Sequence, residues 1–90
     1  MYAIAASYAA LFRMTARTEN DLALKLGVAI RKHRRAQGLS QLKLAELVDC
    51  HINCVGCIER GTRRLSLDML SRFLNALHIS LQDLARMARV

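Results

Sequence analysis

The 90-residue chain contains no proline, only four glycines and only 4% aromatic residues. Proline and glycine disfavour helices and aromatic residues favour strands, so their scarcity, with Leu, Ala and Arg as the commonest residues, favours helix. The chain is also too short for a multidomain enzyme, because a single domain usually takes about 100–150 residues. Hydrophobic residues make up 53% of the sequence, enough for a small core. The sequence therefore predicts one compact all-α domain.

Acidic residues are few as well: seven Asp and Glu stand against fourteen Lys and Arg, which leaves a formal net charge of +7. A basic chain is attracted to polyanions, so nucleic acid is the leading candidate partner and an anionic membrane comes second. No apolar run approaches the roughly 20 residues that a transmembrane helix needs, and we expect no membrane association. The three cysteines are an odd number within residues 50–57, which excludes a disulfide framework and favours the cytoplasm.

The N-terminal 17 residues differ in character from the rest. Residues 1–13 carry no charge before Arg13, and they lack the positive segment that opens a secretory signal. We predict that residues 1–17 are an extension, either flexible or a short helix that packs on the domain or on a second subunit. Residues 18–90 are predicted to be the folded domain.

Capping residues and apolar spacing divide that domain into five helices. Thr18 can cap a first helix over about residues 20–37, and Gly38 can end it in a left-handed conformation. Gly61 can likewise end a third helix over about residues 52–60. The N-cap candidates of the second, fourth and fifth helices are Ser40, Ser66 and Ser80, the last in a capping box with Asp83. The residues expected to face inward at helical spacing are Leu22, Leu26, Ala29, Ile30, Leu44, Ala45, Leu47, Val48, Val55, Ile58, Leu67, Leu70, Phe73, Leu74, Leu77, Leu81 and Leu84.

The second and third helices are short and are joined by a tight turn, as in a helix-turn-helix. The stretch from Gly38 to Leu70 reads GLSQLKLAELVDCHINCVGCIERGTRRLSLDML. It resembles the phage repressor and Cro-type helix-turn-helix family, and the resemblance extends over about residues 24–86. The residues that carry it are Gly38-Leu39-Ser40-Gln41, Leu44-Ala45, Ile58-Glu59-Arg60-Gly61 and Ser66-Leu67. The resemblance implies a lambda-repressor-like domain that binds duplex DNA.

The resemblance also implies which residues hold the DNA backbone. In the family a glutamine at the position of Gln41 grips a phosphate together with nearby backbone N–H groups, and a helix N-terminus favours an anion. The alternative is a solvated glutamine. The predicted backbone contacts are Gln41, Lys43, Arg63 and Arg64. Arg34 and Glu59 occupy positions that form a partly buried structural ion pair in the family.

The third helix is the candidate for the major groove, whose base edges are all distinguishable. Val55 and Ile58 are expected to face the core. The residues predicted to face the bases from the opposite side are Asn53, Gly56 and Cys57, with Ile52 beside them. Asn53 can pair with adenine, Ile52 can touch a thymine methyl group, and a glycine allows close approach. The sequence departs from the family here and in the following loop, where His51 replaces a Ser or Thr cap and Leu65 a common proline.

The cysteines allow a different hypothesis. Cys50, Cys54 and Cys57 have a C-x3-C-x2-C spacing that occurs at iron–sulfur clusters, and His51 could be a fourth ligand. A metal or thiol sensor is therefore one alternative function. The other interpretation has Cys50 as a small buried apolar residue, Cys54 packed near the edge of the second helix and Cys57 exposed, where it could contact DNA. No catalytic constellation occurs, so we predict no enzymatic activity and no cofactor.

These observations predict a transcriptional regulator, a repressor or controller protein, that inserts its third helix into the major groove. A single domain covers only a half-site, so we expect a homodimer, formed through the fifth helix with Met87 and Val90 or through residues 1–13. A further alternative is an interaction module, such as an antitoxin or a bridging factor, that binds a protein partner and holds DNA weakly.

Overall fold

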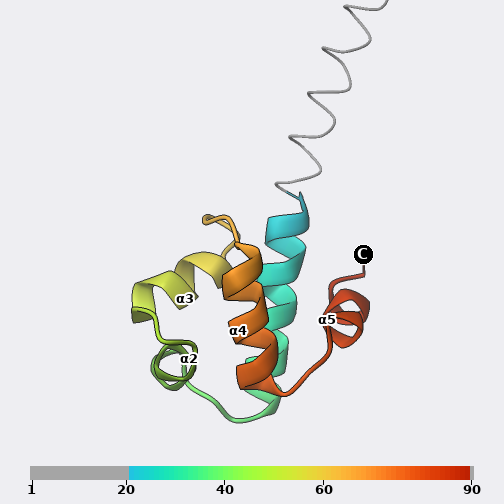
Figure 1. The fold of residues 1–90 in the computed structure, drawn as a ribbon. Coiled ribbons are helices and arrows are strands. Elements are labelled where there is room, and N and C mark those ends of the chain that lie inside the picture. The colour runs from blue at the N-terminus through green and yellow to red at the C-terminus, as the bar shows by residue number, and fades with distance from the viewer. Residues whose placement is uncertain (1–20, 90) are drawn as a thin grey trace, which may run out of the picture.

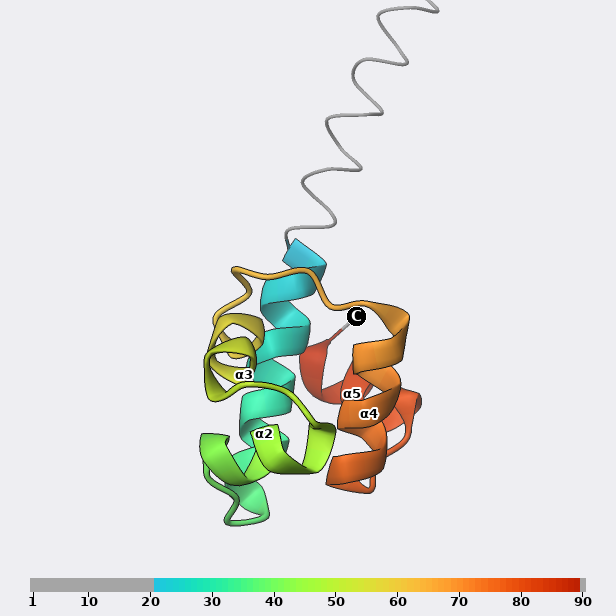
Figure 2. The same ribbon diagram turned by 60° about the vertical axis from the view of Figure 1, so that its left-hand side comes forward.

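The computed structural model describes residues 21–89, and within them it contains helices and no strand. The N-terminal helix of this part runs through residues 21–36. It is followed by α2 (Gln41–Val48), α3 (Ile52–Glu59), α4 (Leu67–Leu77) and α5 (Leu81–Ala88). The helices α2 and α3 lie on one side of the N-terminal helix, and α4 and α5 lie on the other (Figures 1 and 2). The prediction of a five-helix all-α domain is confirmed. The predictions for residues 1–17, for the cap at Thr18 and for Val90 lie outside the described residues.

Serine side chains begin three of the helices, as predicted. The Oγ of Ser40 accepts a hydrogen bond from the N–H of Lys43 at 3.0 Å, and Ser66 caps α4 in the same way. Ser80 and Asp83 form a complete capping box at α5, each side chain accepting from the other's backbone N–H. These bonds satisfy first-turn N–H groups that no helical carbonyl can reach. The capping pattern in the sequence therefore located these helix starts.

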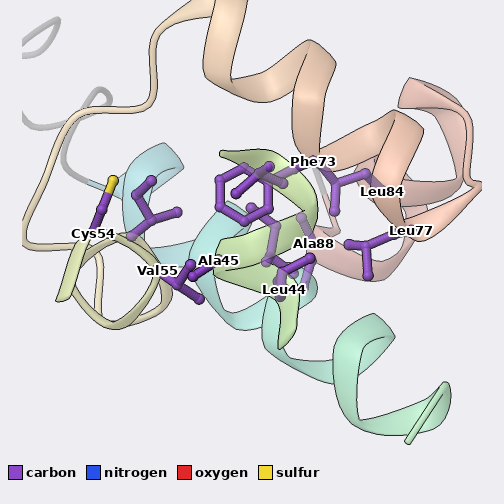
Figure 3. Close-up of a cluster of buried hydrophobic side chains, with 12 residues drawn as sticks. Leu44, Ala45, Cys54, Val55, Phe73, Leu77, Leu84 and Ala88 are labelled. Carbon is purple, nitrogen blue, oxygen red and sulfur yellow. The ribbon is translucent and has the colours of Figure 1, made fainter. Parts of the chain in front are cut away.

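The core lies where the described helices meet. Its largest fully buried side chains are Phe73, Ile30, Leu44, Leu77, Leu84, Val48 and Val55. In Figure 3, Phe73 of α4 lies among side chains of α2 and α5, so one aromatic ring joins the two sides of the domain. Ala45 is 2% exposed, and its small side chain lets α2 lie close to α3. Most of the predicted inward residues are part of this core or pack against it.

Four leucines that were predicted to face inward are exposed: Leu22, Leu47, Leu67 and Leu81. Leu67 and Leu81 are the first residues of α4 and α5, directly after the serine caps, where the side chain lies beyond the packed turns. Leu47 falls outside the stripe that α2 buries through Leu44, Ala45 and Val48. Apolar composition alone therefore overestimated the width of the buried faces.

A close backbone approach fixes the N-terminal helix against α3. Gly27 is buried, and a Cβ added there would overlap the carbonyl oxygen of Ile58 and stand 2.8 Å from that of Glu59. Only glycine allows this contact, because both obstacles are backbone atoms. The contact sets how closely the C-terminal end of α3 approaches the N-terminal helix.

None of the helices in residues 21–89 is both long enough and apolar enough to cross a membrane.

Candidate nucleic-acid interface

A three-residue turn joins α2 to α3. Asp49 ends α2 in the left-handed conformation, with φ 56°, and the N–H of Cys50 donates to the carbonyl of Ala45 at 3.0 Å. His51 then begins α3, because its Nδ1 accepts a hydrogen bond from the N–H of Asn53 at 3.0 Å. The imidazole thus takes the place of the Ser or Thr cap that is usual in the family. The two short helices with this turn form a helix-turn-helix.

The outward side of α3 carries the residues that were predicted to contact bases. Asn53 and Ile52 are exposed at the start of the helix, and Cys57 is half-buried one turn later. The opposite side is closed, since Cys54, Val55 and Ile58 are part of the core. The helix therefore presents a narrow surface that is free to meet a ligand.

Gly56 differs from the other three predicted base contacts, because it is buried. The guanidinium of Arg60 covers it: a Cβ built on Gly56 would lie 3.1 Å from Nη1 of Arg60. The Nη2 atom of the same arginine donates to Cys57 Sγ at 3.6 Å. Sequence reasoning quoted Arg60 only as part of a family motif and missed its place on this surface. The signal was available, since Arg60 follows Gly56 by four residues and Cys57 by three.

A buried ion pair joins the N-terminal helix to α3. Arg34 donates from Nε to Glu59 Oε2 at 2.6 Å and from Nη2 to Glu59 Oε1 at 3.0 Å. The third contact of the guanidinium is the carbonyl oxygen of Leu39, 2.8 Å from Nη1. The hydrogen bond to Glu59 raises the pKa of Arg34 above its ordinary value. The pair fixes the end of α3 from behind, which is the structural role that the resemblance implied.

The same carboxylate also holds Gln41, the first residue of α2. Gln41 Nε2 donates to Glu59 Oε1 at 3.2 Å, and the side chain is half-buried. An amide nitrogen has a second hydrogen to donate, and the first N–H groups of a helix have no carbonyl partner within the helix. The N-terminus of α2 therefore offers oriented donors for an anion such as a phosphate.

The loop after α3 carries two of the predicted cations. Gly61 begins it with φ +72°, and a Cβ there would stand 2.7 Å from the Cα of Leu24. The next residue, Thr62, is bonded to α3, because its N–H and its hydroxyl both donate to the carbonyl oxygen of Cys57. Arg63 and Arg64 follow as exposed residues. The loop is thus tied to the end of α3, so its arginines stay beside that helix.

Lys43, the remaining predicted cation, is exposed on α2, with its Nζ 3.8 Å from Glu46 Oε2. Exposed pairs at this distance are weak, so a phosphate can compete for the lysine.

The cysteines are free thiols in two different settings. Cys54 is buried, whereas Cys50 and Cys57 are half-buried, so the predictions that Cys50 is buried and that Cys57 is exposed were both wrong. Burial raises the pKa of the Cys50 thiol to about 11, which disfavours the thiolate that binds metals and reacts with oxidants. Within residues 21–89 no group of three or more His, Cys, Asp or Glu residues is placed to hold a metal ion. The metal-sensor alternative gains no support from this geometry.

Comparisons with known proteins agree with this geometry. Residues 30–84 match the model of a helix-turn-helix family. The chain is 38% identical over 66 residues to control protein C.BamHI of Bacillus amyloliquefaciens, a match that covers 72% of this chain and 82% of that protein.

Solved structures give the same result. The restriction-modification controller protein C.AhdI of Aeromonas hydrophila is 39% identical, with a TM-score of 0.67 over 69% of this chain and 94% of its own. The clp gene regulator ClgR of Corynebacterium glutamicum is 29% identical in each of two solved structures, with a TM-score of 0.73 over 76% of this chain. The match covers 87% of one of those chains and 72% of the other. The matched region includes the capped helix pair, the turn and the helices that support them. The chain belongs to the helix-turn-helix family of the Cro and phage-repressor type.

Proposed function

We propose that this protein is a transcriptional regulator that binds duplex DNA by placing α3 in the major groove. The observation that carries the proposal is the exposed outward side of α3. The buried ion pair of Arg34 and Glu59 fixes the other side of this helix to the N-terminal helix. A groove about 12 Å wide admits one such helix. The net charge of +7 supplies the long-range attraction to DNA.

The residues divide into two roles. Asn53 and Ile52 contact base edges from the first turn of α3, and Cys57 does so from the second. Gln41 with the N-terminus of α2, together with Lys43, Arg63 and Arg64, contacts phosphates on either side. Base contacts determine which sequence is bound, whereas phosphate contacts add affinity for every sequence.

The active form that we propose is a homodimer. One domain of this size covers a half-site, and a two-fold dimer reads two half-sites about one helical turn apart. The relatives include controller proteins of restriction–modification systems and a gene regulator, which supports a regulatory role. Met87 and Leu81 are exposed on α5, which makes this helix one candidate for the dimer surface.

The direct test is selection of binding sites from a random pool of duplexes at near-physiological salt, followed by sequencing. Enrichment of a two-fold symmetric site is expected, and its centre-to-centre spacing measures the distance between the two α3 helices. Absence of any enriched sequence, with binding that disappears as salt rises, would contradict a sequence-specific regulator. That result would favour the interaction module, for which weak and sequence-independent binding is expected.

The division of roles has its own test on the selected site. Replacement of Asn53 by alanine should relax the preference at one position of each half-site. Replacement of Lys43 or Arg63 by alanine should weaken binding to all sequences and reduce its dependence on salt. Equal effects of all three substitutions on every sequence would refute the division.

A further inference from the structure

The groove-facing residues predicted from the sequence include no cation. Ile52, Asn53, Gly56 and Cys57 are all uncharged, although arginine is the commonest reader of guanine. Arg60 supplies the missing group, because its guanidinium lies over Gly56 and donates to Cys57. The charge thus sits on the part of α3 that the proposed function places in the groove.

The direction of the side chain follows from helix geometry. Side chains of an α-helix lean towards its N-terminus, so a long residue covers the surface one turn before its own Cα. Arg60 is the C-cap of α3, yet its guanidinium reaches back over Gly56, one turn nearer the N-terminus. The backbone position of Arg60 at the end of the helix therefore does not prevent its charge from reaching bases.

Among residues 21–89 the guanidinium of Arg60 has one hydrogen-bond partner, a weakly accepting sulfur. Its Nη2 atom donates to the Sγ of Cys57 at 3.6 Å, and the residue is exposed. A guanidinium has five N–H donors, so one bond to sulfur leaves several for a ligand. Two parallel N–H groups match the O6 and N7 acceptors of guanine, which no other base pair presents together in the major groove.

Gly56 makes this arrangement possible. A Cβ at position 56 would stand 3.1 Å from Arg60 Nη1, closer than ordinary van der Waals contact, so a side chain there requires the guanidinium to shift by a few tenths of an ångström. Because the obstacle is the end of a flexible side chain, the helix itself would stay intact. This explains a glycine in the middle of a short helix, where glycine costs about 1 kcal/mol relative to alanine.

We propose that Arg60 reads a guanine in each half-site and that Gly56 is the surface on which its guanidinium is positioned. The inference rests on the proposed function and adds a specificity-determining residue to it. A guanine is named because the guanidinium lies over Gly56 and beside Cys57, on the side of α3 that the proposed function places against base edges, and its N–H groups match the O6 and N7 acceptors.

The test uses the wild-type protein and the variants Arg60→Ala, Arg60→Lys, Gly56→Ala and Lys32→Ala. Lys32 is exposed on the N-terminal helix, on the side away from the contact of Gly27 with α3, so Lys32→Ala removes one positive charge away from α3. The site selected by the wild type is synthesised with each guanine of the half-site changed in turn to adenine. Dissociation constants are measured for every pair at one salt concentration, and thermal unfolding confirms that each variant is folded.

We expect one guanine-to-adenine change to weaken wild-type binding by about 5- to 150-fold. Arg60→Ala should bind the selected site more weakly by a similar factor and should no longer distinguish guanine from adenine at that position. Arg60→Lys has one ammonium group in place of the two parallel N–H groups of the guanidinium. This variant should therefore retain more of the affinity for the site than of the discrimination between guanine and adenine. Gly56→Ala should lose part of the discrimination while it stays folded, and Lys32→Ala should keep all of it.

Several results would overturn the proposal. A uniform weakening of all duplexes by Arg60→Ala would identify a phosphate contact. Unchanged binding by this variant would leave the guanidinium only as a partner of Cys57. Full discrimination by Gly56→Ala would refute the role of the glycine. Failure of the wild type to select any site would refute the proposed function itself, so the two failures are distinguishable.

Discussion

Replacement of Gly27 by alanine should destabilise the domain, although the same change at an open helix position stabilises it. Alanine gains about 1 kcal/mol over glycine in a helix. At Gly27 the added methyl group would overlap the carbonyl oxygen of Ile58 and stand 2.8 Å and 3.0 Å from the carbonyl oxygen and carbon of Glu59. These are backbone atoms at the end of α3, so no rotamer change can remove the overlap.

The size of the expected loss of stability follows from the displacement that the added methyl group requires. The N-terminal helix has to shift away from α3, which loosens the packing around Ile30 and strains the pair of Arg34 and Glu59. Overpacking of this kind costs about 1–3 kcal/mol, and here the backbone overlap and the strained ion pair lead us to expect the upper end. After the helix-propensity gain, a net loss of about 2 kcal/mol remains. For a domain of this size that lowers the Tm by about 8–16 °C.

The assay is thermal unfolding followed by far-UV circular dichroism, with Gly56→Ala as the matched control. Gly56 is also a buried glycine inside a helix, but only the flexible end of Arg60 stands near its missing Cβ. Gly56→Ala should therefore keep or slightly raise the Tm. An unchanged or higher Tm for Gly27→Ala would refute the argument that this contact sets the distance between the two helices.

Three further predictions concern single side chains. Arg34→Ala should lower the free energy of unfolding by about 3–5 kcal/mol in urea titrations, because it leaves the Glu59 carboxylate buried without its cation. A loss below about 1 kcal/mol would show that the pair contributes no more than an exposed one. The backbone N–H of Ser80 lowers the pKa of Asp83 below its ordinary value of 3.8, so this carboxylate stabilises the fold above that pH and the stabilisation is lost as the pH falls through the lowered pKa. The Tm of Asp83→Asn should accordingly fall less than that of the wild type over the same acid range. Burial raises the pKa of Cys50 to about 11, so iodoacetamide should alkylate this thiol far more slowly in the folded protein than in urea at slightly alkaline pH. Peptide mass spectrometry measures both rates, and equal rates would contradict the burial that raises the pKa.

Local signals in the sequence predicted much of the fold. Serine caps, the left-handed glycines at positions 38 and 61 and the apolar spacing act over a few residues, and each is visible in the chain itself. The exposed Leu67 and Leu81 show the limit of that reasoning. A leucine directly after a cap has the right residue type and spacing for the core, but as the first residue of its helix it precedes the turns that pack against the core.

The features that escaped prediction depend on distant parts of the chain or on the direction of a long side chain. Gly27 is an ordinary helix residue until α3 is placed against it. Gln41 was predicted as a phosphate contact, yet its bond to Glu59 depends on a residue 18 positions away. Arg60 was visible in the sequence, but its relation to Gly56 appears only when the lean of a helical side chain is considered.

The carboxylate of Glu59 connects three elements, since it lies on α3 and accepts hydrogen bonds from Arg34 of the N-terminal helix and from Gln41 of α2. Both helices of the DNA-binding unit are therefore held in one relative orientation before any ligand arrives. A preorganised surface loses little conformational entropy when it binds its ligand. Binding should then lack the large negative heat-capacity change that marks folding coupled to recognition, and the affinity would be governed by contacts with the DNA.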